Sequence, residues 1–382
     1  MTMPQQTPPQ QFTQPPVMPQ PDRNAPRGIG DIQPAQYGRD GRWYPAVNLR
    51  YARRVFSRIG FALLAFFLLT YVFAFVLAAV VEIVYGSDLS ENASLVIASA
   101  AQYVLALPIF LLIIVRVPAV PPQPLPGEPD ARLGVRRWLS LLLMGFPIMY
   151  GGSIIGQLLS QLLSNGKDLN SVESATSVAG PQDLAVQFMM FVVLAPLVEE
   201  FVFRKCLIDR LRPFGEKLAI MTSALLFGLM HGNLYQCFYA FGWGLLWGYA
   251  YLRTGRIRYS IGLHASVNFI GGIIAPLVTS DVDLDALDSL DESDPQALMQ
   301  YLQENGVGLL LLLGWILLIL GLSIAGLVML ILWRHTFMLT ATEGDLAPGN
   351  RYRTALGNPG VVSFMVLTGL LIIGTPLLSA VG

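Results

Sequence analysis

The sequence of 382 residues contains few charged residues, and this shortage excludes an ordinary soluble protein. Only 13% of the residues are Asp, Glu, Lys or Arg, and 54% are hydrophobic, with a mean hydropathy of +0.55. Soluble domains contain about 25% charged residues. We therefore predict a polytopic membrane protein. The net charge of −1 adds little, because the distribution of charge along a membrane protein carries the information.

Other features are also missing from the sequence. Cys206 and Cys237 are the two cysteines, and they give neither a disulfide framework nor a CxxC zinc pattern. The first part of the chain lacks the apolar core of a secretory signal. No internal repeat indicates a transporter built from two related halves.

The N-terminal stretch, residues 1–48, is rich in Pro and Gln. Such a composition cannot bury a core, so we predict a disordered cytoplasmic tail. The tail fits a plain linker, and adaptor binding is the alternative. Beyond it we predict four regions: N-terminal transmembrane helices 49–183, a core 184–280, an acidic extracytoplasmic loop 281–306 and C-terminal transmembrane helices 307–382.

Nine apolar segments follow the tail, and most reach the ~20 residues that a helix needs to span a bilayer. The fifth and sixth are short, but the polar break HGNLYQ separates them. We therefore predict an all-α membrane helix bundle with about nine transmembrane helices. The segments are 58–85, 94–116, 138–163, 184–206, 217–232, 236–252, 259–279, 307–333 and 361–381.

The connections between these segments alternate in charge. Basic clusters lie on every second connection, and acidic or neutral residues lie on the others. By the positive-inside rule, this pattern predicts a cytoplasmic N-terminus and an outside C-terminus. We expect the protein to lie in the plasma membrane. We interpret the acidic stretch Asp281–Asp294 as a solvated loop. A basic partner or calcium is the alternative, although no EF-hand spacing is present.

The fourth segment contains the stretch APLVEEFVFR, with two adjacent glutamates. A charged side chain inside a membrane costs roughly 3 kcal/mol. Glu200 and Arg204 stand four residues apart in the order that favours pairing along a helix. Glu199 is then left to face a cavity, and Pro196 should loosen the helix beside it. The functional interpretation is a carboxylate base beside an ion pair. The alternative places both glutamates at a helix end near the headgroups, paired with Arg204 or Lys205.

Two histidines lie in other apolar segments. His231 closes the fifth segment, and His264 opens the seventh, with Asn268 one turn later. At ~1.5 Å per residue, Glu199 and His264 lie at similar depths from the cytoplasmic side. His231 lies about 21 Å from Lys217, which is too deep unless the fifth helix begins in the cytosol or tilts. A lone membrane histidine more often joins helices, but polar groups on three helices indicate a shared site.

Three short motifs in this region resemble the CPBP family, the CAAX proteases and bacteriocin-processing enzymes. The family's eukaryotic relatives include the type II CAAX prenyl protease. EEFVFR fits EExxxR, FGLMH fits FxxxH and HASVN fits HxxxN, in that order. The resemblance covers about residues 184–280, which would form the catalytic core. It implies that Glu200 and Arg204 support the site.

The resemblance further implies an intramembrane endopeptidase that cleaves a membrane-associated protein or peptide near the cytoplasmic leaflet. Glu199 would activate water with help from His231, and His264 and Asn268 would steady the oxyanion. The chemistry is consistent, because peptide hydrolysis needs a base and a donor aimed at the developing oxyanion.

A metal is the open alternative within this prediction. Glu199, His231 and His264 could hold a catalytic zinc with one open position, but the HExxH arrangement is absent. We favour a metal-free glutamate mechanism, with Zn²⁺ as the alternative. The expected partners are a membrane-associated substrate and the lipid bilayer, and no nucleic acid. The competing function is a non-catalytic transporter, immunity or scaffold protein with a buried Glu/His/Asn network.

Overall fold

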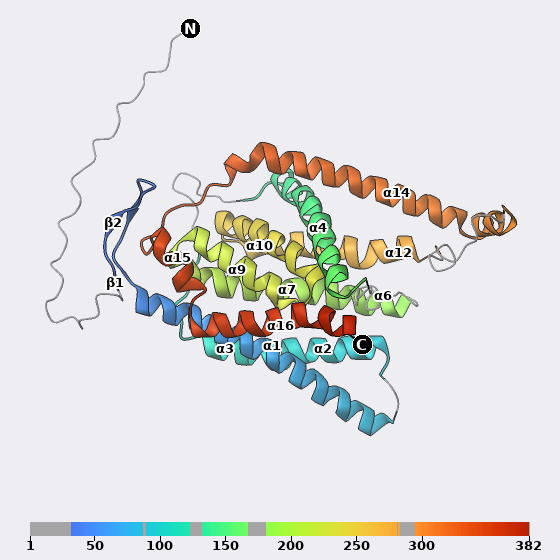
Figure 1. Cartoon of the computed structure of the whole chain (residues 1–382), viewed down its shortest axis with the longest axis horizontal. Helices are drawn as coiled ribbons and strands as arrows, with labels where there is room; N and C mark the ends of the chain where they lie inside the picture. The colour runs from blue at the N-terminus through green and yellow to red at the C-terminus, as the bar shows by residue number, and fades with distance from the viewer. Residues whose placement is uncertain are drawn as a thin grey trace, which may run out of the picture.

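The computed structural model describes residues 32–86, 89–122, 132–166, 181–280, 282 and 295–381. Helices form nearly all of this part of the chain, and the longest of them run roughly side by side (Figure 1). The predicted all-α membrane bundle is therefore confirmed. Residues 281 and 283–294 of the predicted acidic loop lie outside the described residues, and residues 295–306 belong to a helix.

Seven helical stretches in the described residues are long and apolar enough to cross a membrane. Several of these stretches combine α-helical and π-helical turns. The predicted number of nine is not confirmed. The seven stretches are Leu49–Tyr85, Glu91–Ile114, Val135–Leu163, Asp183–Phe214, Ile257–Thr279, Pro295–Thr336 and Pro359–Ala380.

These stretches are built from consecutive elements. They contain α1 (Leu49–Tyr85), α2 (Glu91–Ala100), η1 (Ala101–Ala106), α3 (Leu107–Ile114), α4 (Val135–Leu163), α6 (Pro181–Gln187), η2 (Phe188–Leu194), α7 (Ala195–Glu200), η3 (Phe201–Ile208), α8 (Asp209–Leu211), η4 (Arg212–Phe214), α11 (Ile257–Phe269), η5 (Ile270–Ile274), α12 (Ala275–Thr279), α14 (Pro295–Trp333), η6 (Arg334–Thr336) and α16 (Pro359–Val381).

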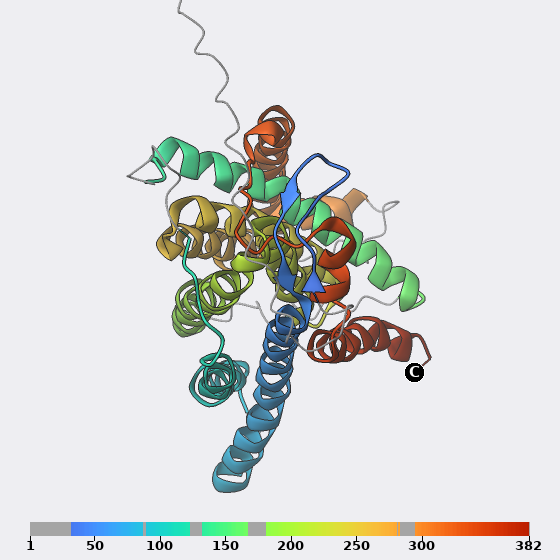
Figure 2. The same ribbon diagram turned by 90° about the vertical axis from the view of Figure 1, so that its left-hand side faces the viewer.

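The predicted fifth and sixth segments are the helices α9 (Glu216–Met230) and α10 (Leu234–Thr254). With 15 residues, α9 is shorter than a typical spanning helix. The two helices pack closely, because a Cβ atom on Gly244 would lie 2.7 Å from the Cα of Ala224. Viewed from one end of the bundle, α9 and α10 lie in the interior, between α1 on one side and α14 on the other (Figure 2).

The residues just before α1 are ordered, which corrects part of the predicted tail. Two antiparallel strand pairs form there: β1 (Ile32–Gln33) with β4 (Val47–Asn48), and β2 (Gln36–Tyr37) with β3 (Trp43–Tyr44).

The reason for this order is a tertiary contact with the chain near the short helix α15 (Pro348–Ala355). The Gln33 side chain is buried, donating to the carbonyl of Asp345 at 3.1 Å and accepting from the N–H of Ala347 at 2.7 Å. The rest of the predicted tail, with the adaptor-binding alternative, lies outside the described residues.

Candidate active site

A buried ion pair between Glu200 and Arg204 forms the structural base of the site. Arg204 Nε lies 3.0 Å from Glu200 Oε2, and Nη2 lies 3.3 Å from Oε1. Both side chains are 0% exposed. The guanidinium also lies over the Phe227 ring, 5.0 Å from its centroid, and donates to Ser223 Oγ at 3.4 Å. The pair is the expected one, and both of its side chains are enclosed by the protein.

His264 connects this ion pair to the second glutamate. Its Nδ1 lies 3.2 Å from Glu200 Oε1, and its ring stacks on Trp247 with centroids 4.6 Å apart. An ionised carboxylate can only accept hydrogen bonds, so we assign the proton to Nδ1. The other ring nitrogen, Nε2, faces Glu199 Oε2 at 3.9 Å.

Glu199 differs from its neighbour in having an unsatisfied oxygen. Its side chain is 22% exposed, but Oε2 is buried and has no hydrogen-bond partner among the described residues. The separation of 3.9 Å from His264 is too long for a hydrogen bond. Buried polar atoms are normally paired with protein or water, so this oxygen is free to bind a third group.

His231 ends α9 at the turn into α10. Its Nδ1 lies 2.8 Å from the carbonyl oxygen of Phe227, which can only accept, so we assign the proton to Nδ1 here too. The Phe227 ring meets the His231 ring edge-on at 5.0 Å and the His264 ring at 6.0 Å. The two histidines therefore share one aromatic neighbour. In the described part of the chain, no hydrogen bond joins His231 directly to Glu199.

The structure also accounts for the apparent excess depth of His231. The sequence-based estimate treated Arg204 as the cytoplasmic end of its helix, whereas Arg204 is fully buried and the span continues to Phe214. Measured instead from Arg212, Glu199 lies about 20 Å along its span, close to the 21 Å estimated for His231.

Asn268 lies one turn beyond His264 and contacts a different part of the site. Its amide Nδ2 donates to the carbonyl of Phe191 at 2.8 Å. Phe191 belongs to η2, which directly precedes the helix α7 that contains Glu199. The amide is thus bonded to the main chain of the Glu199 span.

The side chains of the alternative zinc set come from α7, the end of α9 and α11. The described residues hold no group of three or more His, Cys, Asp or Glu side chains that could bind a metal. In this set, Glu199 and His264 approach each other, and His231 uses Nδ1 for the carbonyl of Phe227, so that Nε2 is its remaining ligand atom. We derive no reaction step through a metal.

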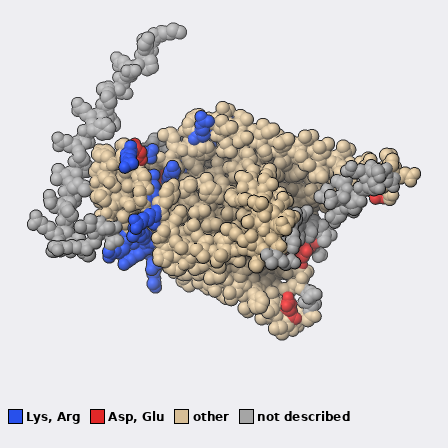
Figure 3. Space-filling model, in the orientation of Figure 1, with Lys and Arg blue, Asp and Glu red and all other residues tan. Residues whose placement is uncertain are grey.

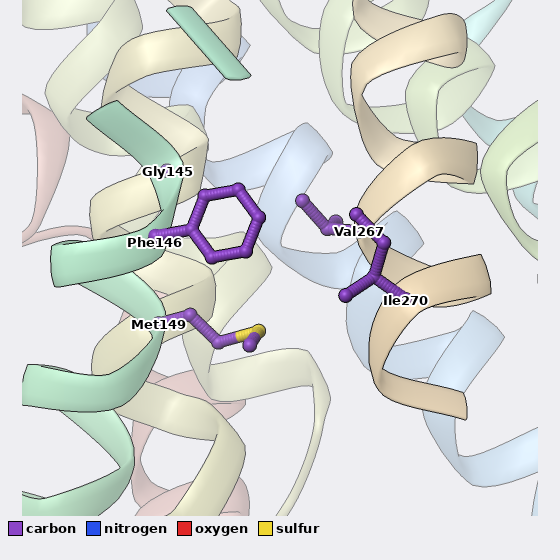
Figure 4. Close-up of a pocket in the computed structure, with 5 residues that line it drawn as sticks. All are labelled: Gly145, Phe146, Met149, Val267 and Ile270. Atoms are coloured by element: carbon purple, nitrogen blue, oxygen red, sulfur yellow. The ribbon is translucent and has the colours of Figure 1, made fainter. Parts of the chain in front are cut away.

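A narrow apolar gap lies beside the site, between α4 and α11. Phe146 and Met149 point from α4 toward Val267 and Ile270 on the other side (Figure 4). Its lining includes no charged or hydroxyl side chain. This gap therefore adds no reactive group to the centre.

Sequence reasoning missed two neighbours of the site. Trp247 stacks on His264, and Ser223 joins Arg204 to the carbonyl of Phe203, to which it donates at 2.6 Å. A signal for Ser223 was present, because it precedes Phe227 and His231 at helical spacing on α9. The partner of Trp247 lies on another helix, and spacing within α10 does not reveal it.

The fold and this centre define a polytopic α-helical membrane protein with a buried carboxylate–histidine site. Residues 181–270 match the family model described as Type II CAAX prenyl endopeptidase Rce1-like. The predicted resemblance to the CPBP family of CAAX proteases is confirmed over these residues. No curated protein matches the chain, and no solved structure matches it.

Proposed function

We propose that the protein is a CAAX-type intramembrane endopeptidase that hydrolyses a peptide bond of a membrane-associated protein or peptide. The observation that carries this proposal is the geometry of Glu199, whose buried Oε2 has no hydrogen-bond partner in the described part of the chain and faces His264 Nε2 at 3.9 Å. A base that can reach a water molecule needs such an unoccupied oxygen. The match of residues 181–270 supports the reaction class.

In the proposed reaction, Glu199 removes a proton from water as the water oxygen attacks the scissile carbonyl carbon. His231 offers Nε2 as a hydrogen-bond acceptor for the same water, since its Nδ1 is directed to the carbonyl of Phe227. Glu199 then transfers the proton to the departing amine as the C–N bond breaks. The base and the acid are thus the same carboxyl group.

The oxyanion formed in the first step needs a donor. In this proposal, doubly protonated His264 donates Nε2–H to the oxyanion, while Nδ1–H stays bonded to Glu200. A donor of this kind contributes about 10²–10³-fold to the rate. Glu200 and Arg204 keep the imidazole in place, because both are fully buried and bonded to each other.

We further propose the orientation of the chain and its membrane. Lys and Arg side chains gather at the end of the molecule near the strands, with one acidic patch among them, and the other visible acidic side chains lie at the opposite end (Figure 3). By the positive-inside rule, this separation supports a cytoplasmic N-terminus and an outside C-terminus. The membrane that we propose is the plasma membrane. The scissile bond would then enter from the cytoplasmic leaflet.

Cleavage by the purified protein in detergent tests the proposal. The probe is a farnesylated, internally quenched peptide ending in a CAAX sequence, together with a quenched peptide library. Wild type should cleave, and Glu199→Gln should lose cleavage while its thermal unfolding stays unchanged. Glu343→Gln, at an exposed position away from the site, is the control and should cleave as wild type does.

A chelator arm decides the metal question. Cleavage that continues in chelator agrees with the metal-free mechanism, whereas loss restored by zinc would assign His231 and His264 as ligands. Equal cleavage by wild type and Glu199→Gln would overturn the role of this residue. If folded wild type cleaves no peptide, the transporter, immunity or scaffold function takes precedence.

A further inference from the structure

Three of the π-helical segments in the described chain share a feature: a proline follows each of them. Pro108 follows η1, Pro196 follows η2 and Pro276 follows η5, each at the second residue of the next helix. Proline has no N–H and crowds the preceding turn. A turn widened to π geometry just before proline fits this restriction.

The hydrogen bonds around each proline show which carbonyl loses its donor. The residue before Pro196 is Ala195, whose N–H bonds to Met190, five residues earlier. In the same register, the N–H of residue 196 would bond to the carbonyl of Phe191. Residue 196 is a proline, however, and has no N–H. The Phe191 carbonyl therefore lacks its main-chain donor.

The Asn268 amide provides the missing donor. Its Nδ2 lies 2.8 Å from the Phe191 oxygen, although the two residues are 77 positions apart. A second contact joins the same two spans, because the rings of Phe188 and Phe269 meet edge-on with centroids 6.2 Å apart. The π turn before Glu199 is thus attached to α11, the helix that contains His264.

We infer that Asn268 is a positioning residue that acts on Glu199 through the Phe191 carbonyl. The bond fixes α11 against the widened turn, and Glu199 lies three residues after Pro196 on the helix that leaves this turn. Fixing this turn sets the direction of the Glu199 carboxylate toward His264. The effect on cleavage rests on the proposed function, whereas the hydrogen bond itself does not.

A proline substitution separates this role from oxyanion binding. Pro196→Ala supplies an N–H that can bond to the Phe191 carbonyl, so Asn268 is no longer needed there. In the wild-type background, Asn268→Ala should lower kcat for the quenched farnesylated peptide by about 100-fold. In the Pro196→Ala background, the same change should cost about tenfold less, as expected for two residues that share one partner.

The matched control is Pro276→Ala, which changes the same APLV sequence in the other span. The N–H that Pro276 lacks would face the carbonyl of Gly271, and no described side chain donates to this carbonyl. Asn268→Ala should therefore lose the same activity in the Pro276→Ala background as in wild type. A loss that is equal in all three backgrounds would overturn the inference and assign Asn268 to the oxyanion.

Thermal unfolding in detergent tests the hydrogen bond without any substrate. Asn268→Ala should lower Tm in wild type and lower it less in the Pro196→Ala background. An unchanged Tm for Asn268→Ala alone would overturn the inference, even if the Pro196 variant does not fold. If the two substitutions are coupled in Tm but neither wild type nor any variant cleaves, the hydrogen bond is supported and the proposed protease function is wrong.

Discussion

Breaking the buried pair between Glu200 and Arg204 should destabilise the protein strongly, and removing both charges should restore much of the loss. Each side chain is 0% exposed, and two hydrogen bonds of 3.0 and 3.3 Å join them. Removing one partner of such a pair costs about 3–5 kcal/mol, because the other charge stays buried without compensation. We expect this cost for Arg204→Met. The double variant Glu200→Leu with Arg204→Met buries no charge and should recover most of it.

The measurement is the free energy of unfolding in mixed micelles. A control with the same spacing is Glu304→Gln on α14, where Gln300 and Glu304 are four residues apart and exposed. Contacts of this kind on a helix surface contribute about 0.2–0.5 kcal/mol. The control should therefore change the free energy of unfolding much less than Arg204→Met. Equal effects at the two sites would refute the reasoning from burial.

Cleavage assays separate the stabilising role of the pair from its role in the site. The double variant removes the carboxylate that lies 3.2 Å from His264 Nδ1. It should regain stability and still fail to cleave, because the imidazole is no longer held toward Glu199. A double variant that cleaves as wild type does would show that Glu200 does not position His264.

Three further changes test contacts at the site, between helices and at the N-terminal strands. Ser223→Ala removes a hydroxyl that bonds both the buried guanidinium and a main-chain carbonyl. It should lower the free energy of unfolding by about 1–3 kcal/mol, and an unchanged free energy of unfolding would contradict this bonding. Gly244→Ala places a Cβ against α9 and should lower the free energy of unfolding by about 1–3 kcal/mol through overpacking. Its control is Gly321→Ala, where an added Cβ meets nothing within 4 Å. Gln33→Ala removes the bonds that fasten the strand pairs and should speed limited proteolysis there; an unchanged rate would disprove that anchoring.

Much of the helical organisation follows from the sequence. Long apolar runs predict spanning helices, and seven of the nine predicted segments coincide with candidate spans. The pair of Glu200 and Arg204 also follows, because an i, i+4 contact depends on one helix alone. The remaining segments, α9 and α10, are helical as expected but pack inside the bundle, where length and hydropathy do not distinguish a span from a core helix.

The depth of residues in the membrane, estimated from the sequence along single helices, was less accurate. Arg204 looked like the end of its helix, because a buried arginine is rare and basic residues usually mark the cytoplasmic side. The structure instead compensates its charge with Glu200 and the Phe227 ring. The strands at residues 32–48 were missed for a related reason, since the buried Gln33 bonds Asp345 and Ala347, which lie more than three hundred positions away.

The sequence by itself determined the membrane class, the helices and the three motifs, because these depend on composition and on spacing within one segment. Tertiary structure alone decided the partners across helices. It placed His264 Nδ1 on Glu200 and Nε2 toward Glu199, and it directed the Asn268 amide to Phe191. The physical reason is that these contacts depend on how separate helices cross and rotate, which the periodicity of each helix leaves open.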